Sequence, residues 1–209
     1  MKHLLLSISI GLALSACSSA QSSEPLLAEK SEAKPAAKLS GQTDTAIFAG
    51  GCFWCVESDF EHLPGVLEAV SGYSGGYLQE PTYRNHGEHL EVAKIIFDPT
   101  IISYEQLLDF YWLHVDPTDP DGQFCDKGHA YKTAIYARPD QLEAAKASKA
   151  KIEKTKPFDA PIVTPVLPAK TFWDAEDYHQ DYYKKNPVRY KAYRTACGRD
   201  RTLQKLWKK

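Results

Sequence analysis

The chain has 209 residues, of which 43% are hydrophobic and 25% are charged, and its formal net charge is -2. This length and composition are typical of one globular domain with an ordinary core, and they exclude an array of domains. Basic and acidic residues are interspersed, so no global field favours nucleic acid, and we expect no nucleic-acid partner.

The N-terminus has the pattern of an export signal. Lys2 precedes a short apolar run, residues 4–14, which is too short to span a bilayer. Residues 14–17 (LSAC) then resemble a lipobox, in which the cysteine becomes the lipid-bearing first residue. We expect residues 1–16 to be removed and Cys17 to be lipidated, which anchors the protein in the cell envelope, facing the periplasm or the exterior. A plain secretory signal, with Cys17 incidental, is the alternative.

Residues 17–44 differ from both of their neighbours in composition. They are rich in Ser, Ala, Glu, Lys and Pro and have no aromatic side chains. Such a segment cannot bury enough apolar surface to fold on its own. We therefore expect a lipidated, flexible tether over residues 17–44 and one folded domain over residues 45–209.

The helices and strands of the folded domain are predicted from hydrophobic spacing and from turn residues. Ser103 begins a helix with Gln106 completing a capping box, and Asp140 with Glu143 predicts the cap of an Ala- and Lys-rich helix. In chain order, we expect strand 45–49, helix 52–62, strands 66–73 and 89–97, a helix from 103 to Asp116, loop 117–130, strand 131–137, the helix after Asp140, and edge strand 162–166.

This order, β-α-β-β-α-β, matches the split β-α-β arrangement of ferredoxin-like folds. We predict an α+β fold, a two-layer sandwich in which helices pack on a mostly antiparallel sheet. The C-terminal residues are expected to form a loop-rich segment that wraps over this sandwich.

Residues 50–57, GGCFWCVE, carry two cysteines at CxxC spacing. The predicted turn puts Cys52 in the first helical turn, where free N–H groups and the helix dipole stabilise a thiolate. We therefore expect Cys52 to be reactive and to be the more acidic of the two. Cys55, one turn further on, is either a redox partner of Cys52 or a buried thiol.

Five short motifs follow one another along the domain. They are GCFW (51–54), PTYR (81–84), H-x-E-V (89–92), D-x-G-x-x-Y (126–131) and EDYHQDY (176–182). Together they resemble the peptide methionine sulfoxide reductase A family over almost the whole domain. The resemblance implies an α+β fold and thiol-dependent reduction of the S epimer of methionine sulfoxide, free or in proteins.

The resemblance also implies roles for the motif residues. Cys52 is the expected nucleophile, and Tyr83 and Tyr131 are the expected hydrogen-bond donors to the sulfoxide oxygen. Glu91 is the expected acid. With period two it shares a strand face with apolar residues, which would raise its pKa and keep it protonated.

Three further residues are expected to shape the substrate site. The resemblance implies that Phe53 and Trp54 form an aromatic wall for the methyl group on sulfur, and that Asp126 helps to hold the oxygen site. His89 is expected to be a supporting strand residue. The histidines have no zinc-finger spacing, and no flavin or nicotinamide motif is present, so we expect neither a metal nor a bound cofactor.

Turnover would leave a sulfenic acid on Cys52, which condenses with a second thiol. The resemblance favours Cys197, in a C-terminal segment that we expect to be a mobile, exposed loop, with Cys55 and Cys125 as alternatives. A thioredoxin-like protein would then reduce the disulfide. Two other functions remain open at this point: general thiol–disulfide exchange through Cys52 and Cys55, and a surface lipoprotein that binds Met-rich partners without turnover.

Overall fold

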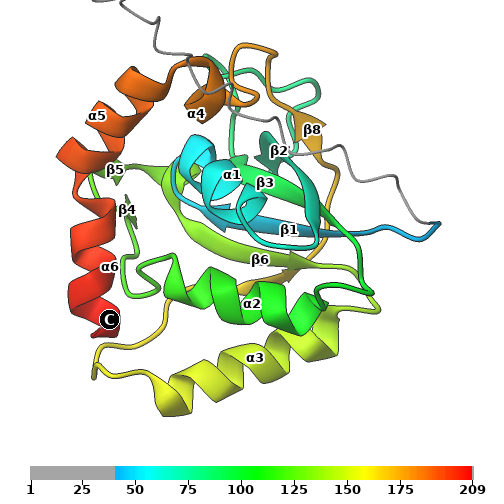
Figure 1. The fold of residues 1–209 in the computed structure, drawn as a ribbon, viewed down its shortest axis with the longest axis vertical. Coiled ribbons are helices and arrows are strands. Elements are labelled where there is room, and N and C mark those ends of the chain that lie inside the picture. The colour runs from blue at the N-terminus through cyan, green and yellow to red at the C-terminus, as the bar shows by residue number, and fades with distance from the viewer. Residues whose placement is uncertain (1–40, 209) are drawn as a thin grey trace, which may run out of the picture. The chain divides into compact units, whose positions relative to one another are not determined.

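The computed structural model describes residues 41–208 (Figure 1). The predicted signal peptide, the predicted lipidation site Cys17 and almost all of the predicted tether lie outside the described residues. The first strand begins at Asp44, one residue before the expected start of the folded domain. Within residues 41–208, no helix is both long enough and apolar enough to cross a membrane.

A six-stranded sheet forms the centre of the domain, with the strand order β7-β6-β1-β3-β2-β8. All neighbouring strands run antiparallel except β6 and β7, so the sheet is mostly antiparallel, as predicted. The strands are β1 (Asp44–Gly50), β2 (Val66–Ser74), β3 (Leu90–Phe97), β6 (Thr133–Ala137), β7 (Val166–Pro168) and β8 (Trp173–Asp174).

Three helices cover one face of this sheet: α1 (Phe53–Glu61), α2 (Tyr104–Leu113) and α3 (Leu142–Thr155). Figure 1 shows α1 in front of the sheet, and α2 and α3 side by side. The core between them is aromatic. The ring of Phe48 on β1 stacks on Phe60 and Tyr111, with centroids 5.2 and 5.0 Å away. Full burial of one such side chain stabilises the fold by roughly 1.5–3 kcal/mol.

Of the two predicted helix caps, the one at α2 is present and the one at α3 is not. Ser103 and Gln106 form the predicted capping box at α2. Asp140 does not cap α3, because its carboxylate accepts hydrogen bonds from the guanidinium of Arg138. The helix starts after Gln141, whose side chain donates to the carbonyl of Thr45 on β1.

The opposite face of the sheet is covered by the chain that leads into β8. Phe172 packs there against a small buried cluster that includes Val92 and Tyr136. A Cβ atom on Gly72 would lie 2.3 Å from the Phe172 ring, so this position on β2 requires glycine.

Two segments between the main elements differ from the sequence prediction. The edge strand lies at Val166–Pro168 instead of residues 162–166. The proline at position 165 has no N–H to donate, and only its carbonyl is hydrogen-bonded to β6, where it accepts the N–H of Ile135. The predicted loop 117–130 contains a small hairpin of β4 (Gly122–Gln123) and β5 (Asp126–Lys127). The 3-10 helix η1 (His129–Tyr131) follows and includes the expected first residue of the next strand, β6, which begins at Thr133.

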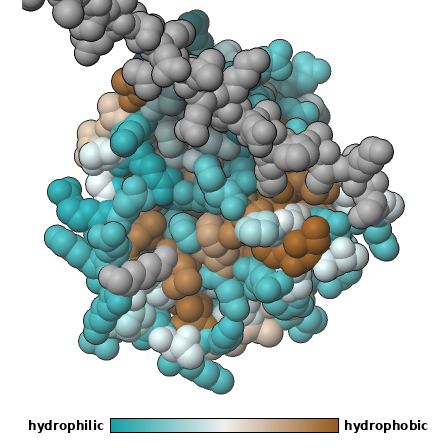
Figure 2. Space-filling view, viewed as in Figure 1, coloured by the Kyte–Doolittle hydropathy of each residue, from teal (hydrophilic) through white to brown (hydrophobic). Residues whose placement is uncertain are grey.

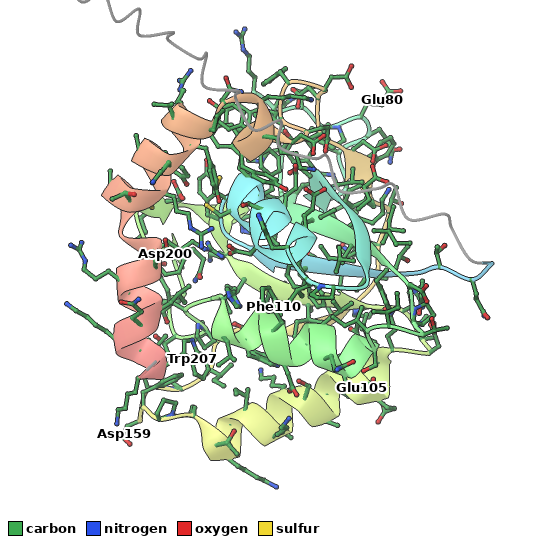
Figure 3. The ribbon with its side chains drawn as sticks, in the orientation of Figure 1. Glu80, Glu105, Phe110, Asp159, Asp200 and Trp207 are labelled. Carbon is green, nitrogen blue, oxygen red and sulfur yellow. A yellow bond between two sulfur atoms is a disulfide. The ribbon has the colours of Figure 1, made fainter. Side chains whose placement is uncertain are left out.

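The prediction of a loop-rich C-terminus is wrong for residues 182–207. They form α4 (Tyr182–Lys185), α5 (Pro187–Cys197) and α6 (Arg199–Trp207), drawn in orange to red in Figure 1. The side chain of Trp207 is buried and meets Phe158 edge-on, on the side of α6 that faces the domain (Figure 3). The apolar stripe of α6 is narrow and the rest of the helix is polar, so the helical pattern is weak in the sequence. The face of the molecule seen in Figure 2 is mainly hydrophilic, with smaller hydrophobic areas.

Candidate active site

A small cavity of about 60 Å³ lies at the start of α1. Seven of its eight lining residues are the predicted nucleophile, acid, oxygen-site and aromatic-wall residues. The lining consists of Cys52, Phe53, Trp54, Tyr83, Glu91, Asp126, Tyr131 and Tyr193. The fold therefore brings together predicted residues that lie up to 79 positions apart in the chain, from Cys52 to Tyr131.

Cys52 stands at the turn between β1 and α1, as predicted. Gly51 has a positive φ of 85°, and a Cβ atom there would lie 2.6 Å from the Cβ of Gln123, so this tight turn requires glycine. Cys52 is the N-cap residue of α1, and its carbonyl accepts the N–H groups of Cys55 and Val56 at 3.0 and 3.3 Å.

Glu91 reaches the cavity from β3. Its side chain is buried, with only 2% exposed, and its Oε2 accepts the N–H of Phe53 at 3.0 Å, one of the unpaired donors of the first turn of α1. Burial raises the pKa of Glu91 to about 8, and the nearby Asp126 adds to the rise. The carboxyl group is therefore mostly protonated at neutral pH, as the apolar strand face predicts.

Two phenol groups complete the polar side of the cavity. Tyr83 and Tyr131 both line the cavity, and burial raises the pKa of both. Tyr83 lies at the mouth, 41% exposed, and its N–H donates to Oε1 of Glu176 at 3.0 Å. Both phenols stay protonated at neutral pH and can donate hydrogen bonds to an oxygen in the cavity.

Tyr193 is the cavity residue that sequence reasoning missed. It comes from α5, donates a hydrogen bond to Asp126 and lines the cavity together with Cys52. It lies outside the five motifs and in a segment expected to be loop. Its position four residues before Cys197 would have been the one signal for it, since residues four apart share a helix face.

Burial acts against the predicted acidity of Cys52. Burial raises the pKa of Cys52 well above its usual range, and the neighbouring Cys55 and Glu91 add to the rise. A hydrogen bond from Cys52 lowers the pKa of Cys55, and Arg199 and Arg194 contribute to that decrease. Desolvation therefore outweighs the helix dipole at Cys52, and the substrate-free cavity holds a protonated thiol.

The aromatic wall is held by the C-terminal part of the chain. The indole N–H of Trp54 donates to Nδ1 of His179 at 3.0 Å, and its ring stacks on Tyr182 with a centroid distance of 3.7 Å. Phe53 lies beside His179 and Tyr73, with centroids 4.9 and 5.8 Å away. Both rings are thus fixed next to Cys52.

The two remaining described cysteines, Cys125 and Cys197, form a disulfide with their Cα atoms 5.0 Å apart. Cys197 is not in a loop, because it is the last residue of α5. Its Sγ lies 3.9 Å from Oδ2 of Asp126, so the disulfide lies behind one wall of the cavity. Within residues 41–208 these two sulfurs and Asp126 are also the one cluster with metal-ligand spacing, and the disulfide occupies both sulfurs.

His89 supports the structure, as predicted. It is buried; its Nδ1 accepts the N–H of Gly76 at 3.2 Å, and its Nε2 lies 2.9 Å from the carbonyl of Leu78. It therefore organises the loop between β2 and β3 and lies outside the cavity.

A mixed α+β domain that surrounds a thiol with a protonated carboxyl group, two phenols and an aromatic wall belongs to the class of thiol-dependent oxidoreductases. The family model of peptide methionine sulfoxide reductase matches residues 44–209. This chain therefore belongs to the peptide methionine sulfoxide reductase family.

Individual relatives agree with this assignment. The peptide methionine sulfoxide reductase MsrA 2 of Rhizobium meliloti is 55% identical over 164 residues, which cover 78% of this chain and 82% of that protein. MsrA 1 of Lactococcus lactis is 48% identical over 169 residues, covering 78% of this chain and 92% of its own. The solved methionine sulfoxide reductase A of Corynebacterium diphtheriae superposes with a TM-score of 0.66 at 32% identity, over 71% of this chain and 78% of that one.

Proposed function

We propose that this chain reduces methionine S-sulfoxide, free or in proteins, to methionine, with Cys52 as the nucleophile. The observation that carries the proposal is the meeting of Cys52, a protonated Glu91 and two phenols in a cavity of about 60 Å³, enough for one small side-chain end. The relatives of this chain are named peptide methionine sulfoxide reductases, which supports the same reaction.

In the first step, the Cys52 sulfur attacks the sulfoxide sulfur. Glu91 protonates the sulfoxide oxygen, and Tyr83 and Tyr131 donate hydrogen bonds to it, since the sulfur becomes electrophilic only when its oxygen carries positive partners. The oxygen is transferred to Cys52 as a sulfenic acid, and the thiol supplies the proton that balances the step. Methionine leaves reduced by two electrons, and Cys52 is oxidised by two.

The aromatic wall selects the methyl group on sulfur. Phe53 and Trp54 offer ring faces and edges, which suit a polarizable thioether better than a charged or strongly polar group. Asp126, held by Tyr193, is placed to support the polar side of the cavity. The site thus has a polar end for oxygen and an apolar end for methyl, and this asymmetry supports discrimination between epimers.

The sulfenic acid is removed in two further steps. The thiol of Cys197 attacks the Cys52 sulfur and releases water, which forms a Cys52–Cys197 disulfide. Cys125 then attacks Cys197 and frees Cys52, which gives a Cys125–Cys197 disulfide at the surface, where a thioredoxin-like dithiol can reduce it. The observed pairing of Cys125 with Cys197, 3.9 Å from the cavity residue Asp126, supports this route.

Peptide mapping after a single turnover tests the order of these steps. Reduced protein is given one equivalent of sulfoxide without reductant, and its free thiols are then blocked. We expect the wild type to end with Cys125–Cys197 linked and Cys125→Ser to accumulate Cys52–Cys197, since the last exchange is blocked. A Cys52–Cys55 link in Cys125→Ser would contradict this route.

General thiol–disulfide exchange through Cys52 and Cys55 is the second candidate function. The CxxC spacing of two free thiols at the start of α1 favours it. Against it, their side chains are only 7% and 2% exposed, so a protein disulfide cannot reach them. Reduction of insulin disulfides at a rate that Cys55→Ser removes would support this candidate over sulfoxide reduction.

We also propose that the core is the ferredoxin-like split β-α-β arrangement. The order β6-β1-β3-β2, with β3 between β1 and β2 and antiparallel to both, supports it. This order explains why Cys52 meets Glu91: the turn that follows β1 lies beside the start of β3.

For the N-terminus we propose lipidation of Cys17 and attachment to a membrane of the cell envelope. The motif LSAC after a short apolar run supports it. The reductant must then lie outside the cytoplasm as well. Cells labelled with a radioactive fatty acid should yield labelled protein, and Cys17→Ser should remove the label; equal labelling of that variant would refute lipidation at Cys17.

A further inference from the structure

Glu57 is a fully buried carboxyl group that the reaction does not use. It lies on α1, one turn after Phe53, is 0% exposed and does not line the cavity. Its Oε2 accepts a hydrogen bond from the hydroxyl of Ser71 on β2, and its Oε1 accepts the N–H of Asp181 at 2.5 Å. A buried carboxyl group is unfavourable unless its partners satisfy it, so this group joins three separate parts of the chain.

The chain around Asp181 is fixed by more than this one bond. Asp181 has a positive φ of 54°, a conformation that a residue other than glycine keeps only where its surroundings hold it. Its neighbour Gln180 pairs with the edge of β2, accepting the N–H of Ser71 at 3.0 Å and donating to its carbonyl at 2.9 Å. Residues 180 and 181 are therefore pinned to β2 and α1.

The residues on both sides of this pinned pair support the aromatic wall. His179 precedes it and accepts the indole N–H of Trp54, and Tyr182 follows it and stacks on the Trp54 ring. Because one residue before the pair and one after it both contact Trp54, a shift of Asp181 moves both supports of this ring at once. Trp54 itself is only three residues before Glu57 on α1.

We propose that Glu57 is a positioning residue for substrate binding: through Asp181 it holds His179 and Tyr182 against Trp54 and so fixes the aromatic wall of the cavity. This inference rests on the proposed function, since the wall matters only if the cavity binds a sulfoxide. It also gives a role to the EDYHQDY motif, residues 176–182, none of which lines the cavity.

The chemistry of the site predicts which substitutions preserve the role. A glutamine at 57 can still accept the N–H of Asp181 and donate to the oxygen of Ser71. Burial raises the pKa of Glu57 to about 7, so the natural group is already half neutral at pH 7. A leucine at 57 has nearly the same size but leaves the N–H of Asp181 without its acceptor.

The test compares Glu57→Leu and Glu57→Gln with Glu61→Gln as matched control. Glu61 lies one turn further along α1 and binds Tyr183 and Lys184, which follow the residues that contact Trp54. With methyl p-tolyl (S)-sulfoxide, Glu57→Leu should raise KM about tenfold and lower kcat by less than about threefold. Glu57→Gln and Glu61→Gln should stay within about threefold of wild type.

A double-mutant cycle separates positioning from general support of the fold. In the Trp54→Ala background, Glu57→Leu should change KM by less than about twofold, because the ring that it positions is absent. The same tenfold rise in both backgrounds would overturn the proposal, and so would an unchanged KM in Glu57→Leu alone. A wild type without sulfoxide turnover would instead refute the proposed function. Thermal unfolding gives the Tm of each variant, and all assays are run well below the lowest Tm.

Discussion

Cys52→Ser is expected to abolish sulfoxide reduction, with a loss in kcat/KM of at least about 10⁴-fold. A serine hydroxyl at this N-cap position is a far weaker nucleophile than sulfur and cannot carry the oxygen as a sulfenic acid. Cys55→Ser should stay within about threefold of wild type with dithiothreitol, because Cys55 does not line the cavity.

Loss of methyl p-tolyl sulfoxide with dithiothreitol as reductant measures both variants. Cys55→Ser is the matched control, since it also removes a buried thiol near the start of α1. A loss in Cys55→Ser as large as that in Cys52→Ser would show that the two thiols act as one redox pair. Full activity in Cys52→Ser would refute the assignment of the nucleophile.

Glu91→Gln is expected to lower kcat/KM about 10²–10⁴-fold and at the same time to stabilise the protein. Glutamine cannot protonate the sulfoxide oxygen, but its carbonyl can still accept the N–H of Phe53. Burial raises the pKa of Glu91 from 4.5 to about 8, so folding at pH 7 requires the carboxyl group to take up a proton. Removing that requirement stabilises the variant by on the order of 3 kcal/mol at pH 7.

The raised pKa of Glu91 also predicts how the stability difference between Glu91→Gln and the wild type changes with pH. A carboxyl group whose pKa is raised on folding favours the folded state fully below pH 4.5, and this contribution is lost as the pH rises to about 8. The free energy of unfolding of Glu91→Gln minus that of wild type, measured with urea, should therefore grow from pH 4.5 to 8 and then level off. A difference independent of pH would contradict a raised pKa at Glu91. The kcat/KM of the wild type should fall above pH 8.

Local pattern placed two residues of the cavity, Cys52 and Glu91, and the family resemblance implied five more: Phe53, Trp54, Tyr83, Asp126 and Tyr131. The two glycines before Cys52 and the helical spacing after it placed the thiol at a helix start, and period two placed Glu91 on the apolar face of β3. These predictions depend on residues close to each other in the chain. Tyr193 was missed because it enters from α5, a helix whose largely polar sequence reads as loop.

Contacts between distant residues determine other features of the site that local sequence does not give. The acidity of Cys52 depends on how completely the fold buries it. That of Cys55 depends on Cys52 and also on Arg194 and Arg199, which lie about 140 residues away in the chain. The pairing of Cys197 with Cys125 likewise depends on where α5 ends relative to the β4–β5 hairpin. Neither packing depth nor helix placement can be taken from local sequence.

The most direct test of the central claim is consumption of racemic methyl p-tolyl sulfoxide by the reduced domain, resolved by enantiomer, with dithiothreitol in excess. A cavity with its oxygen donors at Tyr83, Glu91 and Tyr131 and its methyl wall at Phe53 and Trp54 should accept one enantiomer only. The prediction is that the S form disappears and the R form remains. Consumption of the R form alone, of both forms at equal rates, or of neither would contradict it.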